Sequence, residues 1–209
     1  MTELGWKWRA EELQLNTSIY RGTFDNFQVF QFIPLGANAS VLSLRNAAKV
    51  QTQGLEIEAQ WAVTPSWQMG LSGAYNEATF VSFPNGGGVG IDLANNVLPD
   101  APRTSYSLHS SWTWGNMDEP WTLLIRTNYK SSVFTNPTNN PTTELLPARH
   151  EWFIRLNHEK IQQNWGMSLW IENAFDDQYL LSKNRDFFGH ILERPSRNRQ
   201  VVFQWRKYW

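Results

Sequence analysis

The sequence contains no cysteine. This absence excludes a disulfide-stapled scaffold, a thiolate metal site and a cysteine nucleophile. Charge is also sparse, because Asp, Glu, Lys and Arg make up 18% of the 209 residues and the formal net charge is -1. The two signs are mixed along the chain, so neither nucleic acid nor attraction of a polybasic segment to a membrane surface is expected.

Long apolar runs are missing as well. No stretch approaches the ~20 residues that a membrane-spanning helix needs. Met1–Arg9 has no basic segment followed by an apolar one, so we expect no signal peptide in these residues. The chain begins instead in what resembles a strand, as though it were cut from something longer.

Aromatic residues are abundant, with 12 Trp, 12 Phe and 6 Tyr. Trp and Tyr concentrate where one end of a side chain is apolar and the other is wet, which includes membrane interfaces. The last nine residues place their aromatics with a period of two. One face of this expected strand carries Val201, Phe203, Trp205 and Trp209, and the other carries Val202, Gln204, Arg206 and Tyr208.

Lys207 falls on the apolar face of this terminal strand. It lies two residues from the end, so we expect it near a membrane rim. A charge there costs only ~0–1 kcal/mol, and the long Lys stem can reach towards water.

Nine segments alternate apolar and polar residues in this way, as β-strands with one apolar face do. Three apolar residues interrupt the polar faces: Leu124, Phe153 and Trp170. The predicted strands are 3–9, 13 to about 32, a strand ending with 55–63, 67–76, 105–114, 121–130, 151–159, 165–172 and 201–209.

The connections between these segments alternate between short and long. The short ones lie at 10–12, 64–66, 115–120 and 160–164, and the long ones at 34–40, 81–102, 135–147 and 177–198. Outer-membrane barrels have this order, with tight periplasmic turns and long extracellular loops. The polar faces hold mostly Ser, Thr, Asn, Gln and Gly with isolated charges, which suits a barrel lumen. The pattern favours part of an antiparallel transmembrane β-barrel over a soluble β-sandwich.

An odd number of strands means that the first and the last run in the same direction. They cannot pair antiparallel with each other, and open edges in hydrocarbon leave backbone groups unpaired at a cost of several kcal/mol each. Either further strands come from elsewhere, or the chain is not a stable barrel by itself.

The chain resembles the C-terminal part of the barrel of a TonB-dependent outer-membrane receptor. Arg45–Lys49 followed by Gln53–Glu58 is similar to the family's NAG…GVELE strand, and Leu98–Arg103 to its LPNAPR segment. Glu172–Tyr179 is similar to NLFDxxY, and Arg194–Arg197 leads into a last strand that ends in an aromatic residue. The likeness covers nearly the whole chain, with departures at Ala174, where Leu is usual, and at Trp209, where the family usually ends in Phe.

The resemblance implies about nine strands of a barrel of about 22. It implies that the plug domain, the segment that binds TonB, the signal peptide and roughly thirteen strands lie outside residues 1–209. The complete receptor would import a scarce nutrient, a ferric siderophore above all, and the fragment alone would not transport. Outer-membrane lipid is one implied partner, and the barrel assembly machinery, recognising Phe203, Trp205 and Trp209, is another. The missing plug and strands are further partners, and TonB is reached only through the plug.

Candidate ligand-binding residues lie in the loop 177–198, where basic and aromatic side chains can contact an anionic ferric chelate. A solvated loop cap is the alternative for the same residues, which are Arg185, Phe187, Phe188, His190 and Arg194. A second set is expected to face the lumen, as contacts to plug or ligand or as plain solvated wall: Glu56, Glu58, Arg126, Lys130 and Glu172.

No enzyme is expected, because no nucleophile–base constellation emerges. The four histidines lack compact metal-ligand spacing, and no cofactor is expected apart from iron carried by a transported ligand. The alternative function, from a different class, is a soluble β-sandwich module that stacks sugars on exposed Trp residues.

Overall fold

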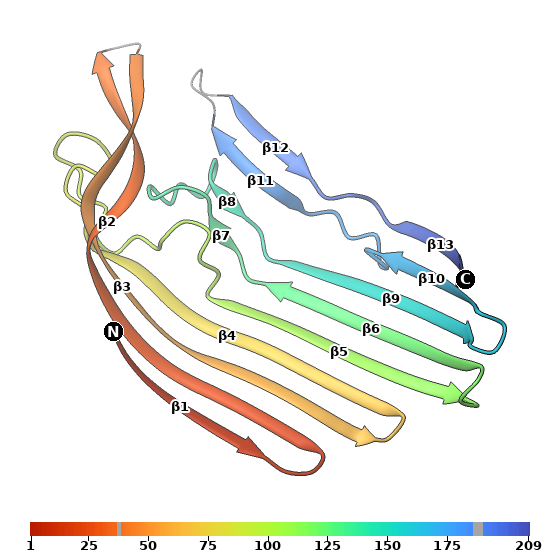
Figure 1. The fold of residues 1–209 in the computed structure, drawn as a ribbon. Coiled ribbons are helices and arrows are strands. Elements are labelled where there is room, and N and C mark those ends of the chain that lie inside the picture. The colour runs from red at the N-terminus through yellow and green to blue at the C-terminus, as the bar shows by residue number, and fades with distance from the viewer. Residues whose placement is uncertain (37–38, 186–189) are drawn as a thin grey trace.

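The computed structural model describes residues 1–36, 39–185 and 190–209. These residues form β-strands and connecting segments (Figure 1). None of these residues forms a helix that is long and apolar enough to cross a membrane.

Nine strands form one antiparallel sheet, and four shorter strands form two hairpins beside it. The order in the large sheet is β1-β2-β3-β4-β5-β6-β9-β10-β13. Its strands are β1 (Thr2–Arg9), β2 (Leu13–Gly36), β3 (Ala39–Thr64), β4 (Trp67–Ser82), β5 (Thr104–Gly115), β6 (Pro120–Lys130), β9 (Arg149–Lys160), β10 (Trp165–Glu172) and β13 (Gln200–Lys207). The hairpins pair β7 (Val133–Phe134) with β8 (Leu145–Leu146), and β11 (Leu180–Arg185) with β12 (Ile191–Pro195).

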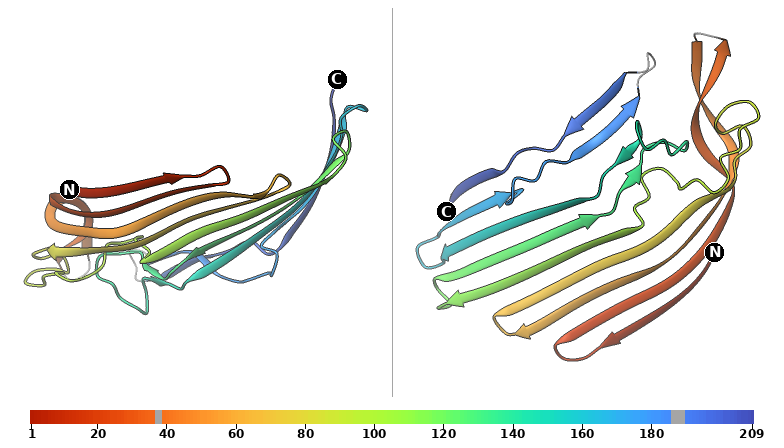
Figure 2. Two further views of the ribbon diagram at one scale, coloured as in Figure 1. Left: turned by 90° about the horizontal axis from the view of Figure 1, so that it is seen from below. Right: turned by 180° about the vertical axis from the view of Figure 1, so that it is seen from behind.

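The nine strands predicted from alternation are confirmed, in the predicted order along the chain. The sheet is a single curved layer, with β1 and β13 as its two edges (Figure 2). The four predicted short turns lie at one rim, and the long connections that follow β4, β6 and β10 leave from the other (Figure 1). Both β1 and β13 run towards the short-turn rim, because Arg9 precedes the first short turn and Lys207 pairs with Trp165 beside the last one.

Two predicted loops are wrong in part. The segment 34–40 was expected to be a loop, but β2 continues to Gly36 and β3 begins at Ala39, so these strands span 24 and 26 residues. The β-branched and aromatic residues that flank this segment favour an extended chain, and this preference prevails over the Pro and Gly signals. Likewise, 177–198 contains the hairpin of β11 and β12.

The outward face carries two aromatic belts separated by aliphatic residues. Trp side chains gather at the short-turn rim, and they include Trp8, Trp61, Trp67, Trp112, Trp114, Trp121, Trp165 and Trp205. A second belt at the loop rim consists mainly of Tyr75, Tyr106, Tyr129, His150 and Trp152. Tyr75 lies eight positions after Trp67 on β4, which is ~26 Å along a strand and ~20 Å across the membrane at a strand tilt of ~40°, comparable with the ~25 Å apolar band of outer-membrane barrels.

The belts are held by ring packing across strands. Trp121 stacks on His158 with ring centroids 4.2 Å apart, and Trp165 meets the same imidazole edge-on at 5.8 Å. In the other belt, His150 hydrogen-bonds Thr127 Oγ1 at 2.6 Å and contacts Tyr106 and Tyr129. Lys207 confirms its expected position at the rim, because its Nζ donates to the carbonyl of Gln163 at 2.8 Å.

The small buried core lies at the loop rim and not within the sheet. It consists of Val29, Val50, Phe80, Phe83 and Leu93. Phe80 and Phe83 pack at 5.1 Å between centroids and are almost fully buried. The sequence pattern gave no sign of this core, because its members come from β2, β3, β4 and the following connection.

The two connections above this core are tied together by side-chain amides. Asn96 Nδ2 donates to the carbonyl of Pro137 at 2.8 Å. Asn139 accepts from the backbone N–H of Val97 at 2.8 Å and donates to its carbonyl at 3.0 Å. The long loops after β4 and β7 therefore form one packed cap on the loop rim.

Candidate functional site

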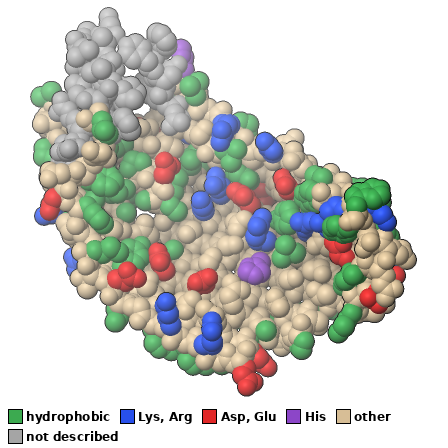
Figure 3. Space-filling model, in the orientation of Figure 1, with side chains coloured by type: hydrophobic (Ala, Val, Ile, Leu, Met, Phe, Trp, Pro, Cys, Tyr) green, Lys and Arg blue, Asp and Glu red, His purple; other side chains and the backbone are tan. Residues whose placement is uncertain are grey.

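The inward face of the sheet is hollowed and polar. Figure 3 shows isolated charged side chains scattered over a background of uncharged polar atoms and backbone. Alternation within each strand fixes this arrangement, because neighbouring residues point to opposite faces and the register aligns polar residues across strands. This inward face is the candidate functional site.

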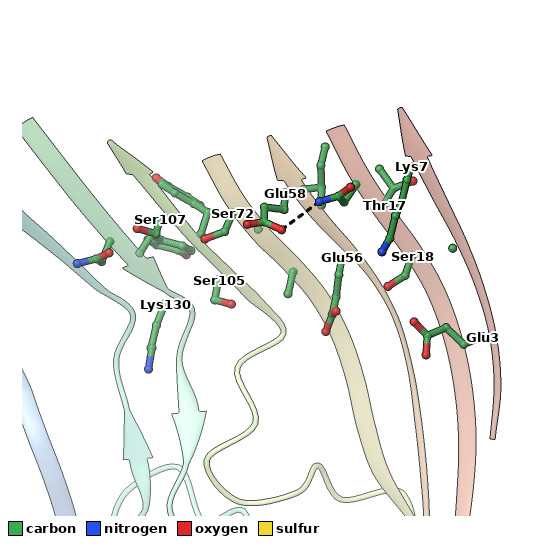
Figure 4. Close-up of a pocket in the computed structure, with 18 of the residues that line it drawn as sticks. Glu3, Lys7, Thr17, Ser18, Glu56, Glu58, Ser72, Ser105, Ser107 and Lys130 are labelled. Atoms are coloured by element: carbon green, nitrogen blue, oxygen red, sulfur yellow. Dashed lines mark hydrogen bonds between the residues drawn. The ribbon is translucent and has the colours of Figure 1, made fainter. Parts of the chain in front are cut away.

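A groove of about 830 Å³ runs along the inward face from β1 to β9. Figure 4 shows that Glu56 and Glu58 of β3 and Lys130 of β6 line this groove. These three side chains were predicted to face the lumen, and the structure places them there. Glu58 accepts a hydrogen bond from Asn16 Nδ2 at 3.3 Å.

The floor of the groove is a strip of small side chains on β4 and β5. It is formed by Ser72, Ala74, Ser105 and Ser107. Glu56 and Glu58 of β3 lie on one side of this strip, and Lys130 of β6 lies on the other with Arg149 and Glu151 of β9, which form an ion pair at 3.3 Å. The groove is therefore wide because its floor is low, and its walls carry charges of both signs.

A smaller cavity of about 350 Å³ lies beside the groove at the level where the strands leave the membrane band. Arg126 and Glu172, both predicted to face the lumen, line it together with Tyr179 and Arg197. Tyr179 lies outside the membrane-spanning strands. Burial, together with the charge of Glu151 and a hydrogen bond to that carboxylate, raises the pKa of the Tyr179 phenol.

A hydrogen-bonded network fills the inward face near the short-turn rim. Arg206 pairs with Glu159 at 2.6 Å, across β13 and β9, on either side of Gly166. Ser168 donates to Asn157 Oδ1 at 2.7 Å, and Arg155 Nε donates to the same oxygen at 2.7 Å. Sequence reasoning missed these contacts, since they depend on the register between strands that are distant along the chain.

Two of the candidate loop residues, His190 and Arg194, line neither the groove nor the cavity. His190 and Arg194 are exposed, and Arg194 lies opposite Ser182 in the outer hairpin. Arg185 ends β11 opposite Ile191, while Phe187 and Phe188 lie outside the described residues. Their role in ligand binding stays a prediction.

The residues predicted as an assembly signal all point away from the inward face or past the strand. Phe203 and Trp205 are more than half exposed on the outward face of β13. Trp209 follows the end of β13 and is fully exposed. Recognition of these residues by the assembly machinery stays a prediction.

Among the residues that the structure describes, no group of three or more His, Cys, Asp or Glu side chains has a metal-binding arrangement. The chemistry available to the inward face is hydrogen bonding and ion pairing with something that lies in or passes through the hollow.

Comparison with known proteins identifies the family. The family described as "TonB dependent receptor-like, beta-barrel" matches residues 2–174. The chain belongs to the TonB-dependent receptor β-barrel family. Barrels of this family are outer-membrane proteins of Gram-negative bacteria, so the expected fold class and location are confirmed, and the family is one of receptors and not of enzymes. A search of curated proteins gives no match.

Solved structures share the fold at low sequence identity. The ferric yersiniabactin uptake receptor FyuA from Yersinia pestis superposes with a TM-score of 0.79 at 16% identity, covering 98% of this chain and 29% of that one. The ferric citrate transporter FecA gives 0.72 at 19%, covering 97% and 30%. The ferric-catecholate import receptor Fiu from E. coli K12 gives 0.69 at 19%, covering 97% and 26%. The chain thus spans less than a third of the length of these relatives.

Proposed function

We propose that the chain is the C-terminal part of the barrel of a receptor that imports a ferric siderophore across the outer membrane by TonB-dependent transport. In this proposal the nine strands are one sector of the barrel wall. A plug, the TonB-binding segment and the remaining strands belong to the rest of the receptor. The 209 residues alone do not transport.

The observation that carries this proposal is the direction of the two edge strands. Both β1 and β13 run towards the short-turn rim and neither pairs with the other. Closing the barrel with antiparallel pairs at both edges therefore needs an odd number of additional strands. The two that pair with β1 and β13 must both run towards the loop rim. Without them, two rows of backbone N–H and C=O groups would face hydrocarbon unpaired.

The outward face supports the same proposal. It exposes large apolar side chains throughout, and Leu4, Ile19, Leu169 and Phe203 are each more than two-fifths exposed. An apolar surface of this extent requires a cover, and in an outer-membrane barrel that cover is lipid.

Two observations support a ferric siderophore as the cargo. Several solved structures with this fold are receptors for ferric chelates, although one is described as the copper transporter OprC. Within this chain, the loop around the outer hairpin carries basic and aromatic residues that suit an anionic chelate, among them Arg185, His190 and Arg194.

Uptake of radiolabelled metal tests the proposal. The gene that encodes this chain is disrupted, and cells are given ⁵⁵Fe as ferric citrate or as a ferric catecholate, or ⁶⁴Cu. We expect loss of uptake of one ferric chelate, restored by the complete gene but not by residues 1–209 alone. Unchanged iron uptake with lost copper uptake would contradict the proposal that the cargo is a ferric siderophore. Uptake restored by residues 1–209 alone would contradict the proposal that these residues cannot transport without the rest of the receptor.

The soluble β-sandwich module is not favoured. In a sandwich, a second sheet packs on the apolar face of the first. The described strands include no such layer, because the two short hairpins lie at the loop rim, leaving the outward face of the nine-stranded sheet uncovered (Figure 2).

A further inference from the structure

The segment that resembles NLFDxxY lies where two neighbouring strands cease to pair. β10 and β13 form a regular ladder as far as the pair of Glu172 and Gln200. Beyond that pair, the same two stretches of chain pair again as the outer hairpin, β11 and β12, starting with Leu180 and Pro195 (Figure 1). Between the two ladders, the seven residues 173–179 face only the four residues 196–199. A regular ladder cannot join these segments, because its residues pair one to one.

Two residues of the longer segment adopt the left-handed backbone conformation. Asn173 has a φ of 50° and Asp176 has a φ of 58°. Asn and Asp enter this region more readily than other residues that carry a side chain. The backbone N–H of Asp176 donates to the carbonyl of Asn173 at 2.9 Å, so the chain makes a tight turn here. This turn takes up the extra length of the longer segment.

Side chains replace the missing ladder between the two segments. Asn173 Nδ2 donates to the carbonyl of Arg197 at 3.0 Å. Asp176 Oδ1 accepts from the backbone N–H of Arg199 at 2.7 Å. Both bonds satisfy backbone groups that a regular ladder would pair, and both come from the residues that make the turn.

Ser196 completes the junction from the shorter segment. Its backbone N–H donates to the carbonyl of Tyr179 at 2.7 Å. Its Oγ accepts from the backbone N–H of Tyr179 at 3.3 Å and donates to the carbonyl of Asp177 at 3.4 Å. Ser196 is 8% exposed, whereas its neighbours Pro195 and Arg197 are exposed. The longer segment therefore folds around this side chain.

The aromatic residues of the same segment attach the junction to β9. Phe175 meets Trp152 edge-on, with ring centroids 5.6 Å apart. Tyr179 hydrogen-bonds the carboxylate of Glu151, and the guanidinium of Arg149 lies 5.7 Å from the Tyr179 ring centroid. The junction between β10 and β13 is thus also fixed to the next strand of the wall.

The outer hairpin has a second attachment further from the sheet. Thr135 Oγ1, in the cap, donates to the carbonyl of Lys183 on β11 at 2.8 Å. Lys183 Nζ pairs with Glu193 of β12 at 3.3 Å, which ties the two strands of the hairpin together. An isolated two-stranded hairpin is marginally stable in water. The direction of the outer hairpin therefore depends on its attachments.

We propose that Asn173, Asp176 and Ser196 form a clip that holds the outer hairpin in one direction relative to the barrel wall. The clip makes the junction a rigid joint and not a hinge. Its role in the receptor is to position the basic residues of the hairpin, among them Arg185 and Arg194. This positioning role rests on the proposed function, whereas the rigidity of the joint does not.

Distances between spin labels test the clip in the complete receptor. Residues 1–209 contain no cysteine, and any cysteine elsewhere in the receptor is replaced. One label is attached at Leu192 on β12 and the other at Ile161 in the turn at the opposite rim, since both side chains are more than half exposed. We expect one narrow distance for the parent. Asp176→Ala is expected to broaden it and to make the Arg199 amide exchange its hydrogen about tenfold faster.

Matched variants separate the clip from general damage to the segment. Asp176→Asn keeps the acceptor oxygen and the left-handed preference, so it is expected to keep the narrow distance. Asp176→Gly allows the turn but lacks the acceptor, so it is expected to broaden the distance without backbone strain. Asp177→Ala makes the same change one position away, where the side chain accepts no hydrogen bond from any residue that the structure describes. It is expected to behave like the parent.

The distances also give the results that would overturn the clip. Heat-dependent migration on gels shows which variants form a closed barrel, and only those are compared. Asp176→Gly serves in place of Asp176→Ala if the alanine variant does not assemble. A broad distance in the parent would show a hinge and overturn the clip. A narrow distance in Asp176→Gly, equal to that of the parent, would overturn it as well.

Uptake measurements test the positioning role separately. With whichever of ferric citrate or a ferric catecholate the receptor imports, Asp176→Ala is expected to raise the KM for uptake and to leave the maximal rate unchanged. Broadened distances with an unchanged KM would overturn the positioning role. If a folded receptor imports neither chelate, the proposed function fails, while the distances still decide whether the clip is rigid.

Discussion

The two faces of the sheet are formed by the same strands but differ in the polarity of their side chains. On β4, Leu71 faces outward midway between the two belts, while its neighbour Ser72 lines the groove. The outward face is mainly aliphatic between two aromatic belts, and its polar residues Ser110 and Thr127 are hydrogen-bonded to Trp67 and His150 of the belts. The inward face is heterogeneous, with charges of both signs around a strip of small residues, and with the apolar residues Leu124, Phe153 and Trp170 on β6, β9 and β10.

This difference indicates which solvent each face meets. Lipid is one uniform environment, so most outward positions carry apolar side chains. The lumen holds specific contacts, so inward positions differ from strand to strand. Exceptions to alternation on the inward face therefore carry information about partners.

The largest predicted effect comes from a charge placed on the outward face, compared with the same charge on the inward face. Leu71→Arg is expected to destabilise the folded barrel by ~2–4 kcal/mol, because the charge would lie near the bilayer midplane. Ser72→Arg is expected to cost far less, since it enters the lumen beside Glu58. Denaturant unfolding of the complete receptor in lipid vesicles measures both. Similar losses for the two variants would contradict the assignment of faces.

The short-turn belt gives the next effect. Trp121→Ala removes the ring that stacks on His158, together with apolar area at the interface. We expect a loss of ~1–3 kcal/mol in the same assay. Trp121→Phe serves as the control and is expected to recover most of the loss. If Trp121→Ala had no effect, the belt would not anchor the wall.

A single methyl group tests the inward network. At Gly166 an added Cβ would overlap with the carboxylate of Glu159, so Gly166→Ala is expected to displace that carboxylate from Arg206. The predicted cost is ~1 kcal/mol, the usual net contribution of one hydrogen bond to stability. Gly5→Ala, where the nearest atom is 3.7 Å away, is the matched control and is expected to be neutral. Equal stability of the two variants would exclude a contribution from the Arg206–Glu159 pair.

The smallest effect concerns pH at the loop rim. Glu77 lies two residues beyond the Tyr75 belt position and accepts hydrogen bonds from Tyr75 at 2.7 Å and from Gln53 at 3.0 Å. These bonds, with the nearby charge of Arg103, lower the pKa of Glu77 below its ordinary value of 4.5. The stabilisation is therefore present above pH ~4.5 and is lost as the pH falls through the lowered pKa.

Unfolding curves between pH 3 and 6 measure this contribution. Glu77→Gln is expected to reduce the loss of stability on acidification. An identical pH dependence for Glu77→Gln and the parent would contradict the role of the Glu77 bonds.

The strands and their faces could be predicted from the sequence because alternation is a local signal. Val201, Phe203 and Trp205 showed their common face without knowledge of any partner strand. The register could not be predicted in the same way. The ion pair of Arg206 with Glu159 joins residues 47 apart and depends on two strand pairings.

The candidate site was predictable only in part. The alternation of side chains along each strand correctly predicted five residues on the inward face: Glu56, Glu58, Arg126, Lys130 and Glu172. Leu124, Phe153 and Trp170 were visible as exceptions, but their assembly into one cluster required the register of β6, β9 and β10. The loop candidates could not be tested by strand periodicity, since loop geometry has no such period.

The most direct test of the account measures the environment of successive residues along β4. The chain has no cysteine, so single cysteines at positions 68–75 can carry spin labels without a background from residues 1–209. In the outer-membrane receptor, accessibility to oxygen, which concentrates in lipid, is expected to rise at 69, 71 and 73 and to fall at 70, 72 and 74. An oxygen profile without this period of two, or with the opposite phase, would contradict the claim that this sheet separates lipid from a polar lumen.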